Sequence, residues 1–161
     1  MGIVHPPIRV LFLCTGNSCR SQMAEGLLRH WSIGLLEVAS AGTNPKPIHP
    51  LAIRCLAEAG IDISGQSSKS VERFQGERID YLITVCDLAK DSCPVFPGAT
   101  KTLHWSLHDP ALAQGSDEDK MKAFRQVRED LQHRIEEFLG RLFDDILQQA
   151  EQMEKSSSLS Q

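Results

Sequence analysis

The 161-residue sequence predicts an α/β protein with a four-stranded parallel sheet, strand order 2-1-3-4, and helices on both faces. Two observations support this fold class. Short segments of apolar and β-branched residues alternate along the chain with helix-like patterns, and that order favours a parallel sheet with right-handed crossovers. The length suits one sizeable core rather than two. We therefore expect a single domain over residues 1–150, followed by a polar, disordered tail over residues 151–161.

Each predicted element has its own sequence pattern. The strands are apolar and β-branched, and they cover Arg9 to Cys14, Leu36 to Gly42, Asp80 to Cys86 and Thr100 to Trp105. The first helix follows the first strand and repeats Met23, Leu27, Leu28 and Trp31 on one face. A second helix begins at Pro50 and ends at Gly60, residues typical of those two ends. The last begins near Ser116 with an acidic first turn, and its apolar stripe consists of Met121, Phe124, Val127, Leu131, Ile135, Phe138 and Leu142.

Composition excludes several classes of protein. The net charge of -4 provides no basic surface for nucleic acid, and no apolar run approaches the roughly 18 residues of a membrane span. The first residues, MGIVHPPIRV, carry no secretory signal. Five cysteines are an odd number, which argues against an extracellular disulfide framework. We expect a cytoplasmic monomer with reduced thiols, no cofactor and no metal.

The stretch LFLCTGNSCRS places a thiol and a guanidinium at the two ends of a short loop between strand and helix. Backbone N–H groups at such a junction point inward, and the helix dipole favours an anion. The predicted oxyanion loop consists of Thr15, Gly16, Asn17, Ser18, Cys19, Arg20 and Ser21. Its positive field predicts a Cys14 thiol with a pKa below the usual value of about 8.5, hence a nucleophile. The alternative is a buried structural cysteine beside a surface arginine, but the C-x5-R-S spacing favours the functional interpretation.

Three further residues are candidates for the same chemistry. Asp109, before Pro110, lies just beyond the fourth predicted strand, where it could serve as a general acid. Cys86 ends the third strand, and strand order 2-1-3-4 makes that strand a neighbour of the first, about 5 Å away. Cys93 follows seven residues later. Three thiols could then exchange in sequence.

Two alternative roles for these cysteines remain open. Cys86 and Cys93 could be independent buried residues, because cysteine often behaves as a small hydrophobe. They could also join His104 and His108 in a zinc site, although the close C-x2-C pairing of structural zinc modules is missing.

Five segments, CTGNSCRSQMAEG, SAGT, GIDISGQSS, ITVCDLAKDSCP and HWSLHDP, together resemble the thioredoxin-coupled arsenate reductases, which are built on the fold of low-molecular-weight protein tyrosine phosphatases. The resemblance runs from about Ile8 to the end of the C-terminal helix. It implies that Cys14 attacks arsenate, that Cys86 attacks the sulfur of the adduct, and that arsenite leaves. Cys93 would then attack Cys86, and thioredoxin would reduce the resulting disulfide.

The same resemblance implies that Arg20 holds the oxyanion and Asp109 manages protons. Family members with a potassium site build it from residues that match Asn17, Glu25, Ser40 and Ser67, with an Asp where this chain has Lys69. We expect the Lys69 ammonium to replace the cation and to donate to the Asn17 side chain or to Glu25. The alternative is a solvated surface lysine.

Two other functions remain open. A phosphatase would use the same loop and Asp109, but hydrolysis needs neither Cys86 nor Cys93. Phosphatases of this fold also tend to carry two tyrosines after the Asp-Pro pair, where this chain has Ala111 and Leu112. A noncatalytic redox or oxyanion sensor is the second alternative.

Overall fold

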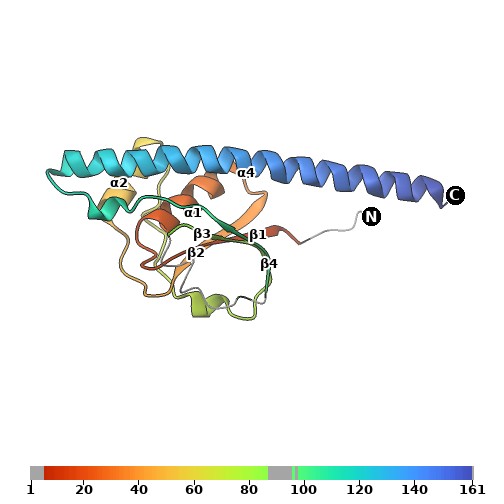
Figure 1. Ribbon diagram of the computed structural model, residues 1–161, viewed down its shortest axis with the longest axis horizontal. Coiled ribbons are helices and arrows are strands. Elements are labelled where there is room, and N and C mark those ends of the chain that lie inside the picture. The colour runs from red at the N-terminus through yellow and green to blue at the C-terminus, as the bar shows by residue number, and fades with distance from the viewer. Residues whose placement is uncertain (1–5, 87–95, 97, 161) are drawn as a thin grey trace.

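The computed structural model describes residues 6–86, 96 and 98–160 (Figure 1). Four strands form one parallel sheet in the order β2-β1-β3-β4, as predicted. The strands are β1 (Ile8–Cys14), β2 (Leu36–Gly42), β3 (Ile79–Thr84) and β4 (Ala99–His104). The helices are α1 (Arg20–Trp31), α2 (Pro50–Glu58), η1 (Val71–Phe74), η2 (Pro110–Leu112) and α4 (Asp117–Leu159). In Figure 1, α1, α2 and α4 lie on one side of the sheet and η1 lies on the other.

The central strand β1 organises the site. Its residues from Val10 to Cys14 are all buried, as expected for a strand covered on both faces. At its C-terminal end, Cys14 is in register with Gly42 of β2, and Leu13 with Thr84 of β3. The loops that follow all three strands therefore meet at one edge of the sheet, which is where α/β folds place their ligand sites.

Helix α2 begins as its sequence predicts. Pro50 occupies the first turn, and His49 caps the helix, its Nδ1 accepting a 3.1 Å hydrogen bond from the N–H of Leu51. The His49 ring also lies against Phe124 of α4, with 4.9 Å between the ring centroids. This cap fixes the start of α2 beside the C-terminal edge of the sheet.

Helix α4 has the predicted start and the predicted buried stripe. Ser116 and Asp119 form a capping box, and the buried residues are the seven that the apolar pattern indicates. The end differs from the prediction: residues 151–159, expected to be disordered, continue the helix to Leu159. No Gly or Pro interrupts this stretch, and extending an existing helix needs no new nucleus. Within the described residues, no helix is long and apolar enough to cross a membrane.

Candidate active site

Cys14 is the last residue of β1, and the loop of residues 15–19 joins it to α1. It is buried, with its Sγ 2.8 Å from the Ser21 hydroxyl, and it accepts a 3.1 Å hydrogen bond from the Asn17 N–H. Asn17 adopts a φ of 48°, in the left-handed region that Asn tolerates better than most residues. The loop thus curls around the sulfur and directs a backbone donor at it, as an anion-binding loop must.

The fully buried side chain of Asn17 holds this loop in shape. Its amide group donates to the hydroxyls of Ser21 and Ser40, both at 2.9 Å. Its Oδ1 accepts from the Gln22 side chain and from the backbone N–H of Lys69, again at 2.9 Å. Four hydrogen bonds therefore tie the loop to α1, β2 and the segment before η1.

Gly42, at the end of β2, allows the loop to approach the sheet. A Cβ at this position would lie 2.6 Å from the Thr15 carbonyl oxygen and 3.0 Å from the Asn17 backbone nitrogen. Neither neighbour is a flexible side chain, so no larger residue fits without moving the loop.

Glu25 is a buried carboxylate beneath the loop. It accepts a 2.8 Å hydrogen bond from Ser40 and forms a 3.0 Å ion pair with Arg29, one helical turn away. The Lys69 ammonium lies 3.7 Å from Oε1 of the same carboxylate. The residues matched to a cation site thus form one hydrogen-bonded cluster.

Lys69 is not a solvated lysine, because its side chain is only 14% exposed. Its ammonium donates a 2.6 Å hydrogen bond to the Ser67 carbonyl oxygen and faces Glu25. Burial lowers the pKa of Lys69, while Glu25 acts in the opposite direction. Of the two expected partners, Glu25 is near the ammonium, whereas Asn17 is bonded by the backbone N–H of Lys69 instead.

Arg20 and Asp109 stand together at the mouth of the loop. The Arg20 guanidinium donates to the Leu107 carbonyl oxygen at 3.1 Å and lies 3.5 Å from the Asp109 carboxylate. Asp109 caps η2 by accepting a 3.0 Å hydrogen bond from the N–H of Ala111. Arg20, Asp109 and Cys14 all line a hollow of about 480 Å³, large enough for a tetrahedral oxyanion.

Cys86 lies just beyond β3 and is buried. Its Sγ is 3.5 Å from the Thr15 hydroxyl oxygen, so the structure places the second thiol beside the loop that holds the first. A second hollow of about 410 Å³ contains Cys86 and shares Arg20 and Asp109 with the first. Cys93 lies outside the described residues.

The protonation of Cys14 differs from the sequence-based expectation. Burial raises the pKa of the Cys14 thiol above its ordinary value, and the neighbouring Cys86 adds to the increase. The hydrogen bonds from Ser21 and Asn17 oppose this but do not outweigh burial. Burial therefore favours the thiol form of Cys14 over the thiolate. The prediction considered the positive field of the loop and omitted desolvation.

Cys19 is also buried in the loop, and burial raises its pKa to about 11. It stays protonated at neutral pH, so its contribution to the loop is space and a backbone N–H.

Sequence reasoning missed three residues that the structure brings to the site. Lys46 and His49 line the hollow beside Cys14, and Gln22 is buried between the loop and Ser67. Gln22 lies within the CRSQMAEG motif, which was the signal that could have found it.

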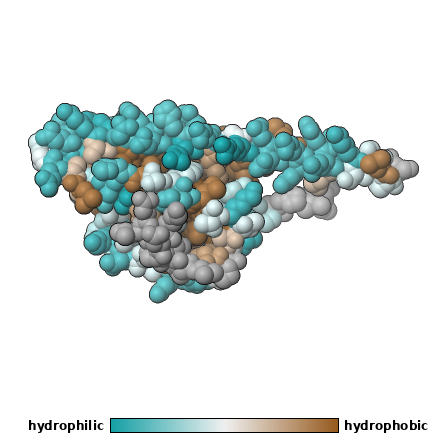
Figure 2. Space-filling view, viewed as in Figure 1, coloured by the Kyte–Doolittle hydropathy of each residue, from teal (hydrophilic) through white to brown (hydrophobic). Residues whose placement is uncertain are grey.

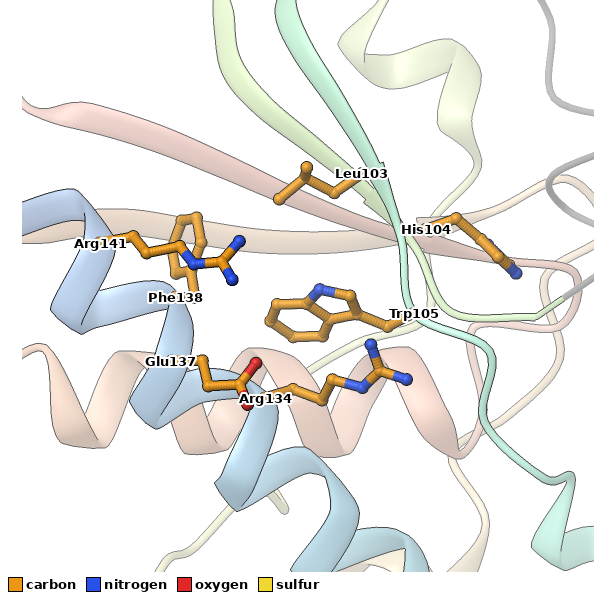
Figure 3. A pocket seen from close by; sticks show the side chains of 7 residues that line it. All are labelled: Leu103, His104, Trp105, Arg134, Glu137, Phe138 and Arg141. Atoms are coloured by element: carbon orange, nitrogen blue, oxygen red, sulfur yellow. The ribbon is translucent and has the colours of Figure 1, made fainter. Parts of the chain in front are cut away.

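Another hollow, of about 280 Å³, lies between the end of β4 and α4, away from the anion loop. Figure 3 shows the Trp105 indole between side chains that come from α4, among them Arg134 and Arg141. None of the predicted catalytic residues lines it.

Over residues 6–86, 96 and 98–160, no cluster of three His, Cys, Asp or Glu side chains could hold a metal ion. The zinc alternative is not tested in full, because Cys93 lies outside that range.

A buried cysteine, an anion loop and a following arginine at the end of a central parallel strand define a class of phosphatase-like proteins. The model of the low molecular weight phosphotyrosine protein phosphatase family matches residues 9–152, and the chain belongs to that family.

Within the family, the chain groups with arsenate reductases. The arsenate reductase of Halalkalibacterium halodurans is 42% identical over 129 residues, which cover 80% of this chain and 93% of the relative. A glutaredoxin arsenate reductase of Synechocystis is 35% identical over 134 residues, covering 83% and 98%. A solved arsenate reductase in the phosphate binding state has a TM-score of 0.72 at 35% identity, over 83% of this chain and 98% of that one. A thioredoxin-dependent arsenate reductase of Corynebacterium glutamicum has a TM-score of 0.67 at 33% identity, over 89% and 65%.

Proposed function

We propose that this protein reduces arsenate to arsenite through a relay of Cys14, Cys86 and Cys93, with thioredoxin as the reductant. The observation that carries the proposal is the Cys86 thiol, 3.5 Å from the Thr15 hydroxyl of the anion loop. Phosphate ester hydrolysis needs one nucleophile and an acid, and it has no use for a second thiol at the loop. A thiol relay within one chain needs a second thiol there.

Atoms and electrons balance in this relay. Arsenate enters the loop between Cys14 and Arg20, and the Cys14 sulfur bonds to arsenic as one oxygen departs as water. Cys86 then attacks the Cys14 sulfur. A disulfide bond forms, and the electron pair of the sulfur–arsenic bond stays on arsenic, which leaves as arsenite. Cys93 attacks Cys86 and frees Cys14, and thioredoxin supplies two electrons to reduce the new disulfide.

Two proton transfers are assigned to residues of the site. Because the Cys14 thiol has a raised pKa, it must lose its proton when the substrate binds. An arsenate dianion about 3 Å away is a suitable acceptor, and the Ser21 and Asn17 donors then stabilise the thiolate. We assign the protonation of the departing oxygen to Asp109, which lies 3.5 Å from the Arg20 guanidinium and lines the same hollow as Cys14.

The reductant is inferred from the third cysteine. One similar protein is described as thioredoxin-dependent and another as a glutaredoxin arsenate reductase. A relay that ends in a Cys86–Cys93 disulfide within the chain suits a dithiol reductant such as thioredoxin. The relay also requires a compartment that keeps thiols reduced, which supports a cytoplasmic location.

The test couples the full chain to thioredoxin, thioredoxin reductase and NADPH and follows NADPH oxidation on addition of arsenate. Wild-type protein should turn over repeatedly. Cys93→Ser should stop after one turnover, with a Cys14–Cys86 disulfide that peptide mass mapping detects. Cys55→Ser, a buried thiol in α2, is the matched control and should keep full activity.

Three outcomes would contradict the proposal. Continued turnover by Cys86→Ser would remove the relay. Hydrolysis of p-nitrophenyl phosphate without arsenate-dependent NADPH oxidation would identify a phosphatase. Turnover with glutathione and glutaredoxin but not with thioredoxin would keep the reduction and replace its reductant.

A further inference from the structure

Helix α4 continues well past the rest of the protein, beyond the end at which the strands begin (Figure 1). Leu142 is its last buried residue. The described residues after it include four large apolar side chains with substantial exposure: Phe143 at 43%, Ile146 at 41%, Leu147 at 62% and Met153 at 62%. Figure 2 shows hydrophobic residues among the hydrophilic ones along this projecting part.

The apolar residues of the projecting part have coiled-coil spacing. Leu139, which packs partly against the core, is followed by Phe143, Ile146, Ala150 and Met153 at intervals of four, three, four and three residues. Such an alternation places all five on one face and is the pattern by which one helix packs against another. A solitary helix of this length is marginal in water, so this face favours a helical partner.

A second apolar surface lies at the same end of the molecule. The turn between α1 and β2 exposes Trp31 at 55%, Ile33 at 81% and Leu35 at 56%. Ile33 has a φ of 45°, which is strained for a β-branched residue. The turn precedes β2, so it lies at the N-terminal edge of the parallel sheet, past which α4 projects (Figure 1). Helix α1 packs against α4, so the end of α1 and the turn after it lie on the same side of the sheet as α4.

We propose that a second copy of this chain covers both apolar surfaces, with the two projecting helices packed antiparallel. In a two-fold dimer the same patch is used twice, so each helix would cover the other's apolar face. The end of each helix, with Leu159 86% exposed, would then reach the Trp31–Leu35 turn of the other copy. This arrangement pairs both exposed surfaces at once, which neither a parallel pair nor a single docked peptide does.

The available area suits a dimer. Taking roughly 200 Å² for each fully exposed large apolar residue, the helix face and the turn together offer about 800 Å² per copy. Two copies would bury about 1,600 Å², the size of a standard specific interface. The expectation of a monomer did not consider this apolar face.

Charge argues against other occupants. The residues after Leu142 carry Asp144, Asp145, Glu151 and Glu154 against Lys155. This acidic balance disfavours nucleic acid and anionic lipid headgroups. The proposed dimer does not cover the candidate active site, because that site lies at the opposite, C-terminal edge of the sheet.

Sedimentation velocity of the full chain over a wide concentration range tests the proposal. Wild-type protein should approach the dimer mass. Ile146→Glu should raise the dissociation constant about 100-fold or more, because the carboxylate would be buried without a partner. Gln148→Glu adds the same charge about 200° around the helix, and it should leave the dimer intact.

Ile33→Asn provides an independent arm. Asn accepts the left-handed conformation better than Ile, so the variant should keep the wild-type circular dichroism spectrum while the dimer weakens. A wild-type chain that stays monomeric throughout, or a dimer equally strong in Ile146→Glu, would overturn the proposal. So would binding of wild-type protein to phosphatidylcholine vesicles that Ile146→Glu abolishes, since the face would then serve a lipid surface.

Discussion

Replacing Lys69 by Met tests whether its ammonium supports the anion loop. Met keeps most of the apolar stem but removes the 2.6 Å hydrogen bond to the Ser67 carbonyl oxygen and the 3.7 Å ion pair with Glu25. A hydrogen bond from a charged donor contributes about 1.5–3 kcal/mol. The lower end applies, because the Ser67 carbonyl also accepts from Gln22. A partly exposed ion pair adds at most about 1 kcal/mol.

The expected loss is therefore about 2 kcal/mol of unfolding free energy, or roughly 4–8 °C in Tm for a chain of this size. Urea unfolding measures the loss. Lys122→Met, an exposed lysine on α4, is the matched control and should change the free energy by less than about 0.5 kcal/mol. Turnover should also fall, because the Lys69 backbone and Glu25 both belong to the cluster that holds Asn17.

The same hypothesis makes a prediction about cations. If the ammonium occupies the place of a cation, wild-type turnover should be equal in sodium and potassium at matched ionic strength. Lys69→Asp, which restores an oxygen ligand, is the variant in which potassium should raise activity. A clear potassium activation of wild-type protein, or a Lys69→Met variant as stable and active as the Lys122→Met control, would refute the reasoning.

Three further results are expected. Gly42→Ala should lower both stability, by about 1–3 kcal/mol, and activity, because its Cβ would meet the Thr15 carbonyl oxygen at 2.6 Å, whereas Gly65→Ala, with open space around it, should do neither in the same melting and turnover assays. Iodoacetamide should alkylate Cys14 in the anion-free protein with a pH midpoint above the ordinary thiol pKa of about 8.5, since burial raises this pKa and the thiolate forms only as pH rises; a midpoint below about 7 would contradict the burial argument. Asp109→Asn should slow the arsenate-dependent burst but leave anion binding, measured by phosphate protection of Cys14, within a few-fold of wild type, and an undiminished burst would remove the carboxyl group from the mechanism.

Local patterns determined most of the fold. The four strands, the start of α2 at Pro50 and the buried stripe of α4 were all predictable from periodicity and capping residues, because these signals depend on neighbours within a few positions. The alternation of strands and helices predicted a parallel sheet with right-handed crossovers, and the expected order 2-1-3-4 is the one observed. The prediction of a disordered tail after residue 150 was wrong, because α4 continues to Leu159. Polar composition suggested disorder, but no helix-breaking residue occurs in this stretch.

In the site, too, the local features were predictable from the sequence and the long-range contacts were not. The C-x5-R-S spacing was sufficient to place Cys14 and Arg20 at the two ends of one loop. Only a few residues separate the end of the strand from the start of the helix, so both side chains must lie near that junction. Whether Cys86 approaches Thr15, whether Asp109 faces Arg20 and whether the Lys69 side chain turns toward Glu25 depend on residues 44 to 89 positions apart. Those contacts are decided by tertiary packing. Strand β3, the segment from β4 to η2 and the segment before η1 all pack around β1, and their positions follow from the whole fold.

The sequence by itself thus determined which groups the protein has for its chemistry, and the tertiary structure decided their electrostatic state. Cys14 shows the difference most directly. The residues around it in sequence predict a lowered pKa, because backbone donors and an arginine favour the thiolate. The folded chain removes water from the sulfur, and that desolvation outweighs the hydrogen bonds from Ser21 and Asn17. Solvent exclusion depends on every element packed around a group, so no local pattern in the sequence could have supplied it.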